Sequence, residues 1–124
     1  MRFAIAILFW ALTCVPLSAH ELTPTYFEMK PSIYAGVYTT TMTMFNRRED
    51  IKYYQIEVFD KDWNPVSFAT NKRIIDLNYL QRTNFEIYFR EKDVAKVMYI
   101  CTRSKILKGE ETSVIASNIC SKIK

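Results

Sequence analysis

Short runs of alternating hydrophobic and polar residues make up most of the chain, and turn-forming residues separate them. Residues 37–46, VYTTTMTMFN, form the clearest run, in which three threonines share one face while Met42 and Met44 share the other. Residues 51–59, IKYYQIEVF, resume the alternation after a polar turn. A period of two places alternate side chains on opposite faces of a strand, and β-branched threonine favours the pleated backbone. The pattern therefore predicts a β-strand in each run.

Further runs of the same kind lie on both sides of these two. Residues 21–29 are extended, but Pro24 lacks the backbone donor that a central strand needs, so we expect an edge strand there. The other strands are expected at residues 66–68, 73–75, 85–90, 95–102 and 112–120. About seven strands with almost no helical pattern predict an all-β fold, an immunoglobulin-like antiparallel β-sandwich.

The N-terminus has the pattern of a secretory signal peptide. Arg2 is followed by an apolar run at residues 3–15, and Ala19 precedes the polar His20. The apolar run has about 13 residues, fewer than the roughly 20 that span a bilayer, so we expect cleavage after Ala19 and no membrane anchor afterwards. The sequence thus predicts a signal peptide at residues 1–19, one sandwich domain at residues 20–124, and a periplasmic or secreted protein.

Charged residues are balanced in sign and dispersed along the chain. There are 17 lysines and arginines against 13 aspartates and glutamates, and removal of Arg2 leaves 16 basic side chains. Because the basic residues do not cluster in any part of the sequence, we do not expect nucleic acid as a partner. The single histidine leaves no Ser-His or Cys-His pair to be completed within the fold, so we expect neither an enzyme nor a cofactor.

Two cysteines, Cys101 and Cys120, remain in the expected mature chain, and an oxidising compartment allows them to pair. Their midpoint falls just after Gly109, where a reversing loop is expected. Residues equidistant from a hairpin turn face each other across two strands, as a disulfide requires. The spacing is too long for a C-x-x-C redox motif, and companion ligands for zinc are absent. We therefore predict a disulfide across a hairpin.

Three segments resemble the N-terminal domain of periplasmic pilus-assembly chaperones. Residues 39–60, TTTMTMFNRREDIKYYQIEVFD, are similar to two strands of that family, the first rich in threonine and ending in an asparagine. Residues 80–90, LQRTNFEIYFR, and 97–106, VMYICTRSKI, are similar to two later strands. The resemblance implies a chaperone that binds another exported protein, such as a pilus or surface subunit, by β-strand addition.

The chain also departs from that family. Those chaperones have two domains and hold the terminal carboxylate of their subunit with an arginine and a lysine. This chain has the length of one domain, and residues 24–30, PTYFEMK, contain no arginine. Lys105 is the nearest basic candidate for a carboxylate anchor, with a solvated surface lysine as the alternative.

The partner-binding strand is expected within residues 104–119. Its apolar residues Ile106, Leu107, Val114 and Ile115 would face a partner, or alternatively close the core of this domain itself. Two other functions stay open. The domain could be a structural or adhesive subunit of a surface assembly, or the free amine and imidazole of His20 could form a weak copper site without further nitrogen ligands.

Overall fold

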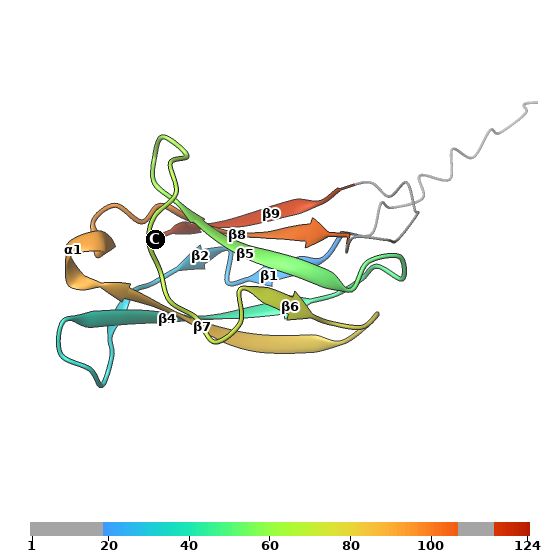
Figure 1. Ribbon diagram of the computed structural model, residues 1–124, viewed down its shortest axis with the longest axis horizontal. Coiled ribbons are helices and arrows are strands. Elements are labelled where there is room, and N and C mark those ends of the chain that lie inside the picture. Colours follow the sequence, from blue (N-terminus) through green and yellow to red (C-terminus); the bar gives the residue numbers. More distant parts are fainter. Residues whose placement is uncertain (1–18, 107–115) are drawn as a thin grey trace, which may run out of the picture.

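The computed structural model describes residues 19–106 and 116–124, which form a two-layer β-sandwich (Figure 1). Its elements in chain order are β1 (Glu21–Thr23), β2 (Tyr26–Phe27), β3 (Lys30–Pro31), β4 (Val37–Phe45), β5 (Tyr53–Phe59), β6 (Ile74–Asp76), β7 (Arg82–Arg90), α1 (Glu91–Val94), β8 (Tyr99–Lys105) and β9 (Asn118–Ile123). The all-β sandwich expected from the alternation is confirmed.

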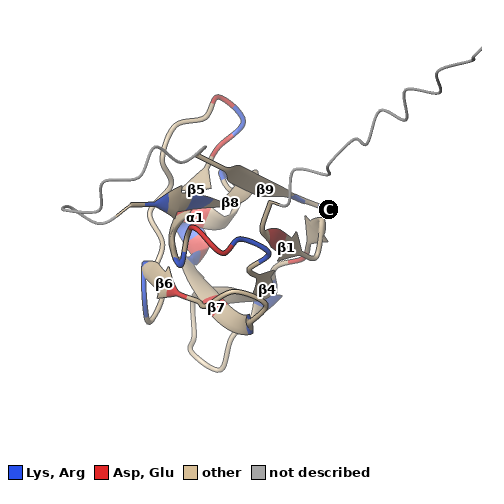
Figure 2. Cartoon of the chain, turned by 90° about the vertical axis from the view of Figure 1, so that its right-hand side faces the viewer, with Lys and Arg blue, Asp and Glu red and all other residues tan. Residues whose placement is uncertain are grey.

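One sheet is built on β4, which pairs with β7 along one side and with β1 and β3 along the other. The second sheet has the strand order β2-β9-β8-β5-β6. The pairs are antiparallel except for β2 with β9, which is parallel. Figure 2 views the molecule along its strands, and it shows basic and acidic residues in both layers.

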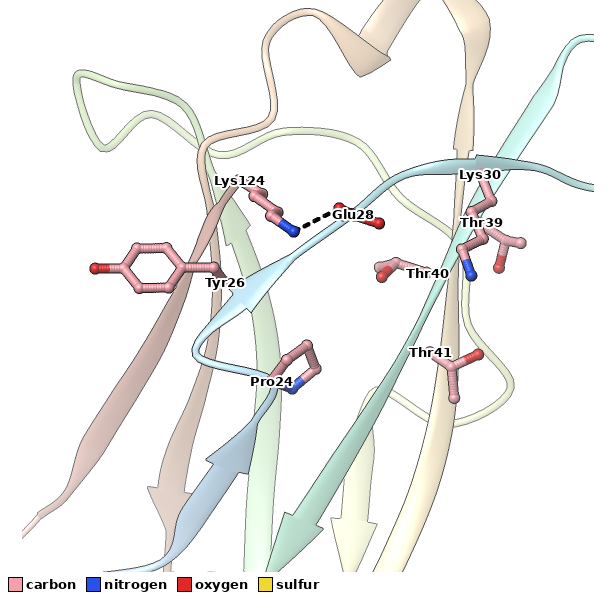
Figure 3. A pocket seen from close by; sticks show the side chains of 8 residues that line it. All are labelled: Pro24, Tyr26, Glu28, Lys30, Thr39, Thr40, Thr41 and Lys124. Atoms are coloured by element: carbon pink, nitrogen blue, oxygen red, sulfur yellow. Dashed lines mark ion pairs between the residues drawn. The ribbon is translucent and has the colours of Figure 1, made fainter.

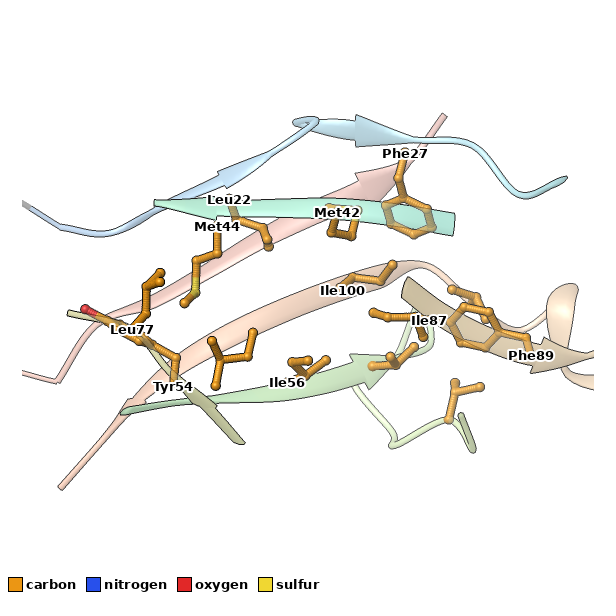
Figure 4. Close-up of a cluster of buried hydrophobic side chains, with 14 of the residues drawn as sticks. Leu22, Phe27, Met42, Met44, Tyr54, Ile56, Leu77, Ile87, Phe89 and Ile100 are labelled. Atoms are coloured by element: carbon orange, nitrogen blue, oxygen red, sulfur yellow. The ribbon is translucent and has the colours of Figure 1, made fainter. Parts of the chain in front are cut away.

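The core lies between the sheets because the long strands bury alternate side chains. Met42 and Met44 of β4 are fully buried, and the threonines between and beside them point to the other face of the sheet. Tyr54 and Ile56 of β5 are buried from the opposite layer. Figure 4 shows these side chains meeting between the layers, together with Phe27, Ile87, Phe89 and Ile100. The alternation seen in the sequence thus identifies the buried face of both sheets.

The N-terminal strand is divided between the two sheets. β1 pairs with β4 in one sheet, and after Pro24 the chain crosses so that β2 pairs with β9 in the other. Proline has no backbone N–H to donate. Because Pro24 lies at the crossing, where the chain pairs with neither sheet, no ladder hydrogen bond is lost. The edge strand expected at residues 21–29 is therefore two short edge strands, one in each sheet.

Residues 66–68, expected to be a strand, are not one. Two isolated bridges flank this segment: Phe59 with Pro65 in one sheet, and Ala69 with Tyr88 in the other. The segment passes from one layer to the other, so it cannot pair continuously with either. The alternation arises because the side chain of Val66 is buried in the core, and not because the segment pairs as a strand.

The strand expected to begin at residue 95 begins instead at Tyr99. The N–H groups of Lys96 and Val97 donate to the carbonyls of Asp93 and Val94, which continues the turn of α1. The Asp93 carboxylate is buried and lies 3.0 Å from Arg90 Nε, which holds the turn against the end of β7. The strand expected at residues 112–120 begins at Asn118, and residues 112–115 lie outside the described residues.

Within residues 19–106 and 116–124, no helix has both the length and the apolar composition needed to cross a membrane.

Replacement of Ile87 by alanine is expected to lower the free energy of unfolding by about 2–5 kcal/mol, because Ile87 is fully buried and its loss leaves a cavity between the sheets. Ile33 is 92% exposed, so Ile33→Ala is a matched control that should change the stability by less than about 0.5 kcal/mol. Urea unfolding of both variants measures the difference. Equal effects would contradict the assignment of the core.

Candidate functional site

The Cys101–Cys120 disulfide joins β8 to β9. The two residues are direct partners in the antiparallel ladder, and their Cα atoms are 4.0 Å apart. The N–H of Ser104 donates to the carbonyl of Ser117, so the cysteines form a pair without mutual backbone hydrogen bonds, the kind in which side chains lie closest. The predicted pairing is confirmed. The reversing loop expected after Gly109 lies outside the described residues.

Part of β9 is an edge of its sheet. β2 covers β9 only at Lys122 and Ile123. The Lys122 N–H donates to Thr25 on that side, so the even-numbered residues of β9 turn their backbone groups away from β8. The N–H and C=O groups of Asn118 and Cys120 therefore point outward, and no strand in the described part of the chain pairs with them.

The apolar residues expected to bind a partner lie beside this edge only in part. Ile106 follows β8 directly and is 43% exposed. Leu107, Val114 and Ile115 lie outside the described residues. Lys105 is the last residue of β8, opposite Tyr53 and half-buried, rather than in the connection after the strand.

His20 is buried rather than free at the N-terminus. Its side chain is 2% exposed, and its ring centroid is 4.5 Å from that of Tyr54. Nε2 lies 2.7 Å from Thr102 Oγ1 and 3.0 Å from the Thr102 carbonyl, and Nδ1 lies 3.1 Å from Ser117 Oγ. A copper ion at either nitrogen would have to displace a protein hydrogen bond, which weakens the case for the copper site.

These partners fix the tautomer of the His20 ring. The Thr102 carbonyl can only accept, so Nε2 carries the proton and Nδ1 accepts from the Ser117 hydroxyl. Burial is the main reason that the pKa of His20 is lowered to about 4, and the nearby positive charge of Arg48 acts in the same direction. The imidazole is therefore neutral and links the segment before β1 to β8 and to the start of β9.

Asn46 organises the same end of the sandwich. It is fully buried, and its amide donates to the carbonyls of Ile51 (2.8 Å) and Leu77 (2.7 Å). Its side-chain oxygen accepts from the Tyr54 hydroxyl (2.6 Å) and from the Arg48 backbone (2.9 Å). Burial raises the pKa of Tyr54 to about 12, so the hydroxyl keeps the proton that it donates. One asparagine thus joins the β4–β5 loop, the β6–β7 loop and strand β5.

A cavity of about 310 Å³ opens where the N-terminal strand crosses between the sheets (Figure 3). Its floor and walls are formed by Pro24, Tyr26, Glu28, Lys30, Thr39, Thr40, Thr41 and Lys124. Glu28 Oε1 lies 3.0 Å from Lys124 Nζ, and this contact lowers the pKa of Glu28. Figure 3 shows Lys30 and Lys124 on opposite sides of the cavity. Such a lining can bind polar groups by charge and hydrogen bonds.

Sequence analysis did not find this cavity, because its residues come from both ends of the chain and from β4. The one local signal was Pro24 inside an otherwise extended segment. Among the described residues, no three His, Cys, Asp or Glu side chains lie close enough together to hold a metal ion. The β9 edge with Ile106 and this cavity are therefore two candidate surfaces.

Removal of the disulfide by the double substitution Cys101→Ala and Cys120→Ala is expected to lower the free energy of unfolding by about 3 kcal/mol, because the bond closes a loop with a sequence separation of 19. Urea unfolding measures the loss. Dithiothreitol should destabilise the wild type by a similar amount and leave the double variant unchanged. If the reductant acted equally on both proteins, the disulfide would not be the cause.

Acid is expected to destabilise the protein through His20. Between its ordinary pKa of 6.5 and the folded value of about 4, only the unfolded chain takes up the proton, so stability falls as the pH falls through this window. The loss should approach about 3 kcal/mol by pH 4 and be absent above pH 7. Urea unfolding from pH 8 to pH 4 should show this slope in the wild type and a smaller one in His20→Gln. Identical slopes in the two proteins would refute the assignment.

Comparison with models of protein families, with curated proteins and with solved structures finds no match for this chain.

Proposed function

We propose that this protein is an exported protein-binding module that acts by β-strand addition, in the manner of the pilus-assembly chaperones that three of its segments resemble. The partner would be another exported protein, such as a pilus or surface subunit. The observation that carries the proposal is the open stretch of β9, where Asn118 and Cys120 turn their backbone groups outward.

Strand addition suits this stretch because the unpaired backbone groups of β9 and the apolar side chain of Ile106 lie near each other. An edge offers donors and acceptors to an incoming strand, and nearby pockets or side chains give specificity. Ile106 is 43% exposed and lies at the same end of the hairpin as Asn118, since Ser104 bonds to Ser117 between them. A bound strand would cover both features.

Export is supported by the disulfide. Structural disulfides persist in oxidising compartments and are rare in the cytosol of mesophiles. The Cys101–Cys120 bond is compatible with a periplasmic or secreted protein, as the apolar segment at residues 3–15 also suggests.

Photocrosslinking tests the proposal directly. A photoreactive amino acid at Ile106 or at Asn118, in cells that make the protein naturally, is expected to capture a partner protein that mass spectrometry identifies. The same probe at Lys61, an exposed residue in the loop after β5, is the control and should not capture it. Probes at Ile106 and Asn118 that capture only a second copy of this chain, or nothing, would contradict the proposal.

A backbone variant separates strand addition from other contacts at the same place. The N–H of Asn118 points away from β8, so Asn118→Pro removes an outward donor while the β8–β9 ladder keeps its bonds. This variant should stay folded and lose the crosslink at Ile106. A crosslink of undiminished yield would show that the partner does not bind as a strand.

Cell fractionation distinguishes the second candidate function. A chaperone is recovered from the periplasm, whereas a structural or adhesive subunit is recovered with surface structures or particles. Recovery in the surface fraction would favour the subunit.

A further inference from the structure

β7 forms the other edge of the β4 sheet, and part of this edge is open. At the ends of the β4–β7 ladder, Asn46 donates to Gln81 and Glu91 donates to Gly36. The odd-numbered residues of β7 therefore bond to β4, and the even-numbered residues turn their backbone groups to the free side. Tyr88 confirms this direction, since it exchanges two backbone hydrogen bonds with Ala69.

The open stretch extends over residues 82–86, except that the carbonyl of Glu86 already accepts one side-chain hydrogen bond. Ala69 covers the edge at Tyr88, and the Thr70 hydroxyl donates to the carbonyl of Glu86 (2.8 Å). No strand in the described part of the chain pairs with the outward backbone of Arg82, Asn84 and Glu86. A groove of about 550 Å³, with Ile75 and Phe85 in its wall, lies along this stretch.

The side chains of this stretch are complementary to their own sequence read backwards. Arg82, Asn84 and Glu86 share the exposed face, while Thr83 and Phe85 turn toward the core. A second copy of the stretch can be laid antiparallel to the first with Asn84 opposite Asn84. Arg82 of each copy then lies opposite Glu86 of the other, which gives two pairs of opposite charge. The same register pairs outward backbone groups only with outward backbone groups, as an antiparallel ladder requires. The Glu86 carbonyl would then use its second lone pair, since the first accepts from the Thr70 hydroxyl.

Both charged groups are available for such pairs. No carboxylate lies within 4.0 Å of Arg82 and no basic group within that distance of Glu86 among the described residues. Arg82 lies over the Phe45 ring, 5.1 Å from its centroid, and Glu86 accepts a hydrogen bond from the Tyr88 hydroxyl. Residues four apart on a strand are separated by roughly 13 Å, too far for Arg82 and Glu86 of one chain to pair with each other.

We propose that two copies of this protein associate through residues 82–86 of β7, antiparallel about a two-fold axis at Asn84, with Arg82 of each copy paired to Glu86 of the other. The two β4 sheets then form one continuous sheet across the interface, and the exposed part of Phe85 is covered. The β7 edge and the β9 edge lie on opposite sides of the molecule. Dimerisation through β7 therefore leaves the β9 edge free to bind a partner.

Charge reversal tests the register. In sedimentation equilibrium over a concentration series, Arg82→Glu and Glu86→Arg should each weaken the dimer by about tenfold or more, because two attractive cross-strand pairs become repulsive. The double variant should restore the wild-type dissociation constant. An equimolar mixture of the two single variants should form a heterodimer, since both of its pairs are then of opposite charge.

Two further variants control for charge and for folding. Lys61→Glu makes the same change of charge as Arg82→Glu at an exposed loop position and should leave the dimer unchanged. Asn84→Pro removes an outward N–H without touching the β4 ladder and should give a folded monomer, as judged by circular dichroism. A protein that is monomeric at all concentrations overturns the proposal, and so does a dimer that Arg82→Glu does not weaken.

Discussion

Each of the two sheets buries one face against the other sheet, and the rest of the structure depends on that constraint. The strands can satisfy it only by alternating, so Met42 and Met44 face inward while Thr41 and Thr43 face out. Side chains that point outward and backbone groups at the strand edges are what remains for recognition. The candidate surfaces are accordingly the strand edges, with the groove beside β7, and the cavity at the crossing.

Polar groups close one end of this apolar core. Asn46 satisfies the backbone of loops that would otherwise leave buried carbonyls unpaired, and Tyr54 joins it to the core. His20 extends the same set of buried hydrogen bonds to the segment before β1. Buried polar groups are costly unless fully paired, so this end specifies one arrangement of the loops.

The sequence predicted most of the sheet and little of the polar core. Alternation located β4 and β5, and the symmetric spacing of Cys101 and Cys120 about a turn located the disulfide. Both signals are local or depend on a single hairpin.

Features that depend on distant parts of the chain could not be predicted in the same way. Residues 66–68 alternate like a strand but cross between layers, and only the three-dimensional path shows this. Asn46 and His20 are polar residues, which a sequence alone places in an exposed turn or near a terminus. Their burial depends on hydrogen-bond partners up to 97 positions away. The open edge of β7 required the ladder pattern, because a sequence does not tell which side of a strand is unpaired.

The contact between His20 and Ser117 has a consequence for how the chain is made. Ribosomes synthesise a protein from its N-terminus, so His20 emerges long before Ser117 does. β2 cannot pair until β9 has been made, although β1 can already pair with β4. This side of the sandwich is therefore completed only once β9 is available, and a chain that ends before Ser117 would lack both the His20–Ser117 contact and the β2–β9 pairing.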